Sequence, residues 1–160
     1  MRVARSLVLA TGCLLAAASH ASADATIFFG STTAPAVRQA RGFAIGGGIL
    51  VLGFEFEYSD TREDALDAAP ALRTGMGNIL LQTPVAFYGF KPYFTTGAGG
   101  YHESLGGASE TQLGANVGGG VKMRLLGPLR ARFDYRVFRL RGTPLYDVVH
   151  RFYVGANVSF

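Results

Sequence analysis

Charged side chains that recur at every second position within apolar segments are the residues with the clearest chemical potential. Glu55 and Glu57 alternate with Phe54 and Phe56, and four more charges, Arg130, Arg132, Asp134 and Arg136, alternate with apolar residues in 129–140. Alternate residues of a β-strand share one face. Buried charges persist only when they are paired. We therefore expect one charge network, in which Arg132, Arg136 and Lys122 bind the carboxylates. Its members are Glu55, Glu57, Lys91, Lys122, Arg132, Asp134 and Arg136.

One short segment, His102-Glu103-Ser104, has the residue types of a hydrolase. A working Ser–His pair needs an acid that orients the histidine, and the candidate Glu110 lies across a predicted loop. His102 and His150 have no metal-binding spacing. We therefore predict no catalytic residues, no metal site and no cofactor.

The N-terminal segment predicts export. Arg2 and Arg5 precede an apolar run over 7–18, which ends in the small residues of an A-x-A cleavage site at Ala23. We predict a secretory signal peptide over 1–23 and one domain over 24–160. The single cysteine, Cys13, lies in this segment, so the domain has no disulfide. Lipidation at Cys13 is the alternative.

Composition narrows the class of protein further. Removing Arg2 and Arg5 from the formal charge of +4 leaves +2, and with no Lys-rich tract this argues against nucleic-acid binding. Hydrophobic residues make up 49% of the chain, yet no apolar run after residue 23 is long enough for a spanning helix. The 22 glycines disfavour long helices, so strands are expected.

Period-2 alternation predicts eight strands. Their expected ranges are 25–30, 42–48, 52–59, 73–82, 89–101, 111–124, 129–140 and 150–160. The intervening segments alternate long and short, with long loops at 31–41, 60–72, 102–110 and 141–149. This pattern is typical of a closed, antiparallel, up-and-down β-barrel that crosses a membrane, in which the first strand pairs with the eighth.

The charges decide which face points inward. A charged side chain facing lipid near the bilayer midplane costs about 2–4 kcal/mol, so the apolar face of each strand must be the outer one. An eight-stranded barrel has a bore just wide enough for side chains. We therefore expect the charge network to plug the lumen. A gated ion path in which the salt bridges exchange partners is the alternative.

The last predicted strand carries the strongest family signal. In HRFYVGANVSF, apolar residues from Phe152 to Phe160 alternate with polar or small ones. Gly155, Val158 and the terminal Phe160 resemble the C-terminal signature of bacterial outer-membrane β-barrels, and residues 24–160 resemble the small OmpA/OmpX-type barrels. The resemblance implies a location in the outer membrane and recognition of Gly155, Val158 and Phe160 by the barrel-assembly machinery.

Arginines and aromatic residues accumulate around the long connections. Guanidinium groups bind phosphates in bidentate geometry, so contact with lipopolysaccharide is expected from Arg38, Arg41, Arg62, Arg73, Arg139 and Arg141. An aromatic belt at the membrane interface is expected on the same side from Tyr58, Tyr101, Phe138 and Tyr146.

The sequence thus predicts a monomeric outer-membrane barrel with an envelope-structural or surface-facing role, surrounded by outer-membrane lipid and lipopolysaccharide, and not an enzyme. A lipid A-modifying barrel enzyme and a secreted, soluble lipocalin-like barrel that binds a small apolar ligand are the alternatives. A lipocalin hides its apolar face inside, so outward-pointing Arg132 and Arg136 would favour it.

Overall fold

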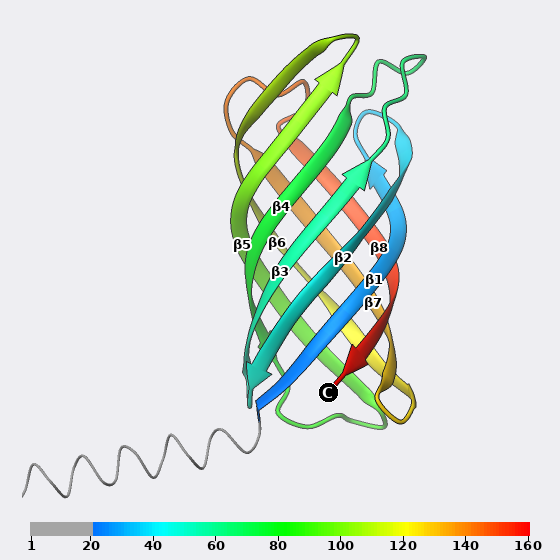
Figure 1. Ribbon diagram of the computed structural model, residues 1–160, viewed down its shortest axis with the longest axis vertical. Helices are drawn as coiled ribbons and strands as arrows, with labels where there is room; N and C mark the ends of the chain where they lie inside the picture. Colours follow the sequence, from blue (N-terminus) through cyan, green and yellow to red (C-terminus); the bar gives the residue numbers. More distant parts are fainter. Residues whose placement is uncertain (1–20) are drawn as a thin grey trace, which may run out of the picture.

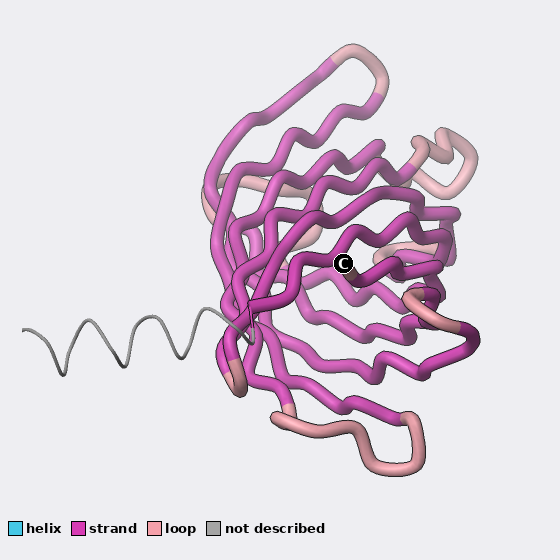
Figure 2. The backbone as a smooth tube through the Cα atoms, turned by 60° about the horizontal axis from the view of Figure 1, so that its bottom comes forward, coloured by secondary structure: helices cyan, strands magenta, loops and turns pink. Residues whose placement is uncertain are grey.

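Residues 21–160, the part of the chain that the computed structural model describes, form eight antiparallel strands (Figure 1). Their bounds are β1 (Ala21–Thr33), β2 (Val37–Ile49), β3 (Leu52–Thr61), β4 (Ala71–Gln82), β5 (Phe90–Leu105), β6 (Ala108–Leu126), β7 (Leu129–Leu140) and β8 (Val148–Ser159). Figure 2 shows that these strands and their connections make up the whole described chain. Within residues 21–160, no helix is long and apolar enough to cross a membrane.

The sheet closes on itself. Each strand pairs with its neighbours in the sequence, and β1 also pairs with β8, where Phe28 faces Gly155. Backbone hydrogen bonds of 2.9 Å in both directions between Ala23 and Phe160 extend this seam. Closure pairs the backbone N–H and C=O groups of β1 and β8, which would otherwise lack hydrogen-bond partners in lipid. The predicted all-β, closed, antiparallel eight-stranded barrel is therefore confirmed.

The two ends of the barrel differ. The loop end carries the connections 34–36, 62–70, 106–107 and 141–147, and the turn end carries 50–51, 83–89 and 127–128 together with Phe160. The predicted signal peptide lies outside the described residues except for Ala21–Ala23, which begin β1.

The strands run further toward the loop end than predicted. The segments expected as loops at 31–41 and 102–110 are mostly paired strand, and the β5–β6 hairpin extends to Leu105 and Ala108 (Figure 1). Gly106 and Gly107, both with positive φ, close this hairpin in a two-residue turn that other residues rarely adopt. Of the four predicted long connections, 62–70 and 141–147 are long, but those at 34–36 and 106–107 are short, because polar residues near them continue the strands instead of ending them.

The faces of the wall are arranged as in a membrane barrel. The exterior carries a belt of exposed apolar side chains, which includes Ile27, Phe29, Phe43, Ile45, Phe54, Phe56, Ile79, Leu81, Phe94, Val117, Phe152 and Val154. Arg132 and Arg136 instead lie inside and are fully buried. This arrangement is the opposite of the lipocalin-like alternative, in which the apolar face lines the interior.

Candidate functional site

Charged side chains from opposite walls meet in the middle of the lumen. Glu55 on β3 reaches β7, where its Oε1 lies 3.1 Å from Arg132 Nη2 and 2.9 Å from Arg136 Nη2. Asp134 also accepts from both arginines, at 3.1 Å from Arg132 Nη2 and 2.9 Å from Arg136 Nε. Since β3 and β7 are not neighbours in the closed sheet, the ion pairs of Glu55 cross the bore, whereas those of Asp134 lie within β7.

A second group of charges lies against the first. Glu57 Oε2 is 3.2 Å from Arg136 Nη1, and Arg151 on β8 binds both Glu57 and the hydroxyl of Ser59. Sequence reasoning missed Arg151, although the alternation of the last strand places it on the inward face with Tyr153. The network is thus neutral, with three carboxylates and three guanidiniums: Glu55, Glu57, Asp134, Arg132, Arg136 and Arg151.

An aromatic side chain positions the acid on β7. Tyr93, Gly120 and Asp134 face one another across β5, β6 and β7. The Tyr93 hydroxyl donates to Asp134 and accepts from Arg132 Nε at 2.7 Å. A Cβ on Gly120 would lie only 2.5 Å from Tyr93 Oη. A glycine at this position therefore gives the ring the space to cross β6 and reach the network.

The two predicted lysines lie nearer the turn end than the network does. Lys122 is buried and pairs with Asp24 of β1, not with the carboxylates of the network as predicted. Lys91 faces Lys122 across the β5–β6 pair and is half-buried. Sequence reasoning did not find Asp24, because the predicted first strand began after it.

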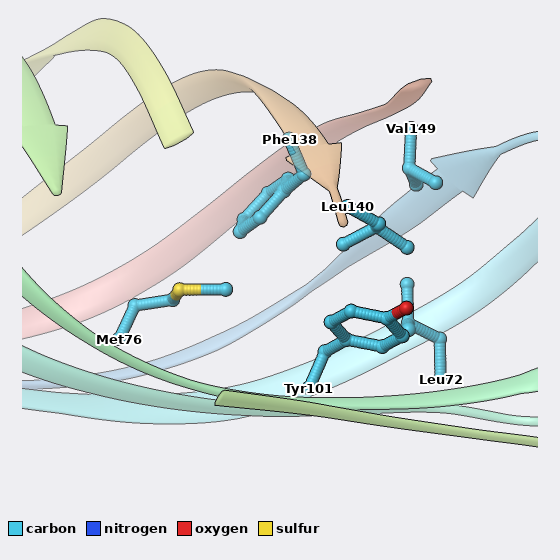
Figure 3. Close-up of a cluster of buried hydrophobic side chains, with 6 residues drawn as sticks. All are labelled: Leu72, Met76, Tyr101, Phe138, Leu140 and Val149. Atoms are coloured by element: carbon cyan, nitrogen blue, oxygen red, sulfur yellow. The ribbon is translucent and has the colours of Figure 1, made fainter. Parts of the chain in front are cut away.

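An apolar layer separates the network from the loop end. It consists of six buried side chains, shown in Figure 3: Leu72, Met76, Tyr101, Phe138, Leu140 and Val149. The Arg151 guanidinium lies 4.4 Å from the Phe138 ring centroid, so the layer packs directly on the charges. Tyr101 and Phe138 were predicted in an outer aromatic belt. Both lie inside, because they share the inward face of their strands.

Arg38 was predicted to face lipopolysaccharide, but the structure places it inside the mouth at the loop end. Its side chain is buried, and its guanidinium donates to the carbonyls of Ala34, at 2.7 Å, and Pro70. The prediction treated 31–41 as a loop, whereas Arg38 lies in β2 on the inward face with Ala40. Arg38 and the buried Glu103 thus add a polar lid above the apolar layer.

The other predicted arginines divide between two walls. Arg41 and Arg73 flank Asp60 on the outer surface, with N–O distances of 3.5 Å and 3.2 Å, and the exposed Arg62 follows β3. Arg139 and Arg141 are exposed beside β7, on the opposite wall. The structure therefore brings together Arg41, Arg62 and Arg73 but forms no continuous ring.

Beside these arginines lie two shallow clefts. One of about 240 Å³ is lined by Phe29, Gly30, Gln39, Ala40, Arg41, Asp60 and Arg62. The next, of about 560 Å³, is lined by Ile27, Phe28, Phe29, Arg41, Gly42, Phe43, Tyr58, Asp60 and Arg73. Both clefts therefore combine an apolar floor with a cationic rim.

His102 and Glu110, the residues with hydrolase character, contact threonines of other strands and loops. His102 Nδ1 lies 2.7 Å from the Thr111 hydroxyl, and Glu110 binds the amide and hydroxyl of Thr143. Among the described residues, no cluster of three or more metal-ligating side chains is present.

The residues of the predicted assembly signal lie at the β1–β8 seam. Gly155 is buried on the inward face, where an added Cβ would lie 2.9 Å from Thr26 Cγ2. Val158 is exposed on the outer face, and Phe160 is 75% exposed at the turn end. Two of the three residues are therefore exposed.

A closed eight-stranded barrel with an ionic lumen and an apolar exterior is the architecture of small outer-membrane β-barrel proteins. Solved structures of that class match this chain. Neisserial surface protein A aligns with a TM-score of 0.69 and 17% identity, over 88% of this chain and 97% of its own. The N-terminal barrel of Pseudomonas aeruginosa OprF aligns with a TM-score of 0.67 and 14% identity, over 87% and 97%.

The outer-membrane enzyme PagL aligns with a TM-score of 0.54 and 13% identity, over 84% of this chain and 98% of its own. The sequence itself matches no known protein family and no curated protein. The chain therefore has the fold of outer-membrane barrels, a fold shared by an enzyme and by other surface proteins.

The network generates a prediction about stability. Glu55→Gln removes one carboxylate and leaves Arg132 and Arg136 under-compensated, which should lower the free energy of unfolding by about 3–5 kcal/mol. Equilibrium urea unfolding of the refolded barrel in lipid vesicles measures this loss.

The exposed Glu63→Gln is the matched control and should change stability by less than about 0.5 kcal/mol. The double variant Glu55→Gln/Arg132→Gln restores neutrality and should recover part of the loss. A Glu55→Gln barrel as stable as the wild type would contradict the role assigned to the cross-lumen pairs.

Proposed function

We propose that this protein is a monomeric structural barrel of the bacterial outer membrane whose lumen is sealed. The filled bore carries the proposal: the charge network joins opposite walls, and the apolar layer covers it toward the loop end. An ion entering the lumen would have to displace paired, buried charges and then pass an apolar constriction. In the proposed orientation, the loop end faces outside and the turn end faces the periplasm.

Planar-bilayer recording tests the seal. Wild-type protein should show no channel openings under conditions in which an open porin, reconstituted in the same way, conducts. The gated ion path remains the second candidate, since Arg136 contacts three carboxylates between which it can exchange partners. Discrete wild-type openings with a conductance altered by Arg136→Lys would support that candidate and contradict the seal.

We further propose that the cluster of Arg41, Arg62 and Arg73 binds lipopolysaccharide phosphates. Arg41 and Arg73 share one acid, Asp60, so a positive charge remains for an anion. The adjacent clefts have apolar floors that an acyl chain could contact. A ligand that carries both a phosphate and an acyl chain would contact the arginine cluster and the apolar floors together.

Arg41→Gln/Arg73→Gln should weaken binding of lipopolysaccharide to the detergent-solubilised barrel by about tenfold or more, since each lost charge-assisted contact contributes about 1.5–3 kcal/mol. Arg139→Gln/Arg141→Gln removes the same charge from the opposite wall and is the control. Surface plasmon resonance on immobilised barrel measures the affinity. Equal losses in the two variants would indicate a non-specific charge effect and reject the site.

The proposed role is not enzymatic. His102 hydrogen-bonds Thr111, and Glu110 is engaged by Thr143, so neither is arranged to activate Ser104. The lipid A-modifying alternative is distinguished by mass spectrometry of lipid A from cells with and without the protein. A mass difference that disappears in Ser104→Ala would establish it.

We propose that Gly155, Val158 and Phe160 act as the assembly signal, because Val158 and Phe160 are exposed where a folding factor can bind them. Phe160→Ala should reduce the heat-modifiable, folded form in cells several-fold, whereas its yield on refolding into detergent should match the wild type. Phe152→Ala, an exposed residue of the same strand outside the signal, is the control. Equal losses in cells and in detergent would indicate a purely structural effect.

A further inference from the structure

The mouth of the lumen at the turn end gathers positive charge. A cleft of about 430 Å³ is lined there by Lys91, Lys122, Arg124 and Arg130, with the β4–β5 connection forming its outer wall. The remaining lining residues are Pro84, Val85, Ala86 and Gly89, so the described lining contains four cations and no acid. Lys122 is almost completely buried at the inner end of the cleft.

The strand register places like charges directly opposite each other. Lys91 faces Lys122 across β5 and β6, and Arg124 faces Arg130 across β6 and β7. Like charges at directly opposed positions destabilise a sheet. Among the ion pairs of residues 21–160, Lys122 binds Asp24, and the other three cations have no carboxylate partner.

This mouth differs from the rest of the lumen in its charge balance. The central network matches each guanidinium with a carboxylate, whereas only Lys122 of the four cations that line the mouth has an acidic partner, Asp24, within residues 21–160. The fold does not require this excess of positive charge. A neutral side chain in place of the half-exposed Lys91 would preserve β5 and remove the repulsion with Lys122. A bound anion would compensate the repulsion, because arginine forks and ammonium groups converge on the same cleft.

We propose that the turn-end mouth is a binding site for a phosphate-bearing anion, with Lys91, Arg124 and Arg130 as its ligands and Lys122 as a buried positive charge behind them. The chemistry fits either a free phosphate compound in the periplasm or the headgroup of an anionic phospholipid. Binding can be measured on the purified barrel in detergent and does not depend on the cellular role proposed above.

The direct test is titration of pyrophosphate into the full-length mature barrel in zwitterionic detergent, followed by calorimetry and ³¹P NMR line width. Arg124→Gln/Arg130→Gln should weaken binding by about tenfold or more, the loss expected when charge-assisted hydrogen bonds are removed. The control, Arg139→Gln/Arg141→Gln, removes the same charge at the loop end and should bind within about twofold of the wild type. Failure of the wild type to bind, or equal weakening in both variants, would overturn the proposal.

A stability measurement gives an independent test, because a binding role and a structural role of Lys91 predict changes of opposite sign in the thermal midpoint. In anion-free, low-salt buffer, Lys91→Gln should raise the thermal midpoint of the heat-shift gel, because it removes a repulsive pair. Pyrophosphate should raise the wild-type midpoint more than that of Lys91→Gln. A lower midpoint for the variant in anion-free buffer would assign Lys91 to structure and count against the site.

Nanodiscs distinguish the two sources of phosphate. Pyrophosphate binding to the barrel in phosphatidylcholine nanodiscs is compared with binding in nanodiscs that contain phosphatidylglycerol. A several-fold loss with the anionic lipid, absent in the Arg124→Gln/Arg130→Gln barrel, would identify the headgroup as the occupant. Equal binding in both nanodiscs would identify a free anion. Both results require that the barrel binds pyrophosphate at the turn-end mouth.

Discussion

The ion pairs of Glu55 with two arginines of the opposite wall, Arg132 and Arg136, are the interactions on which the arrangement of the lumen depends. A barrel in lipid cannot place charges on its exterior near the bilayer midplane, so the charged faces of β3, β7 and β8 must share one narrow bore. In that bore each charge is stable only beside its opposite, and the network is accordingly neutral. The pairs therefore compensate the charges and also tie together strands that the sheet does not join directly.

The layers along the barrel axis follow from this constraint. The neutral network occupies the middle, the apolar layer built around Phe138 and Met76 covers it, and Arg38 and Glu103 close the loop end. The turn end is different, because four cations line its cleft and only Lys122 among them has an acidic partner, Asp24, within residues 21–160. The lumen is thus filled by apolar side chains toward one end and positively charged toward the other. The proposed structural role and the proposed anion site are compatible in the same molecule because they use different layers.

Much of the fold could be predicted from single strands. In β3 and β7, the alternation of charged and apolar residues is regular, and the predicted bounds of β7 agree with the structure at both ends. Predictions were less accurate wherever polar residues continue a strand past its apolar segment, as at Arg38 and in the β5–β6 hairpin. Tyr101 and Phe138 were assigned to an outer belt from residue type alone, although the alternation of β7 already placed Phe138 on the inward face.

The sequence by itself determined the closed barrel and the side of the wall on which Glu55, Glu57, Arg132 and Arg136 lie, because a period of two and the cost of charge in lipid are local properties. Only the tertiary structure decided which charged residues pair with each other. Arg151 and Glu57 are 94 residues apart, and Lys122 and Asp24 are 98 residues apart. Which charges meet depends on the stagger of the strands after closure, and that stagger is a property of all eight pairings together.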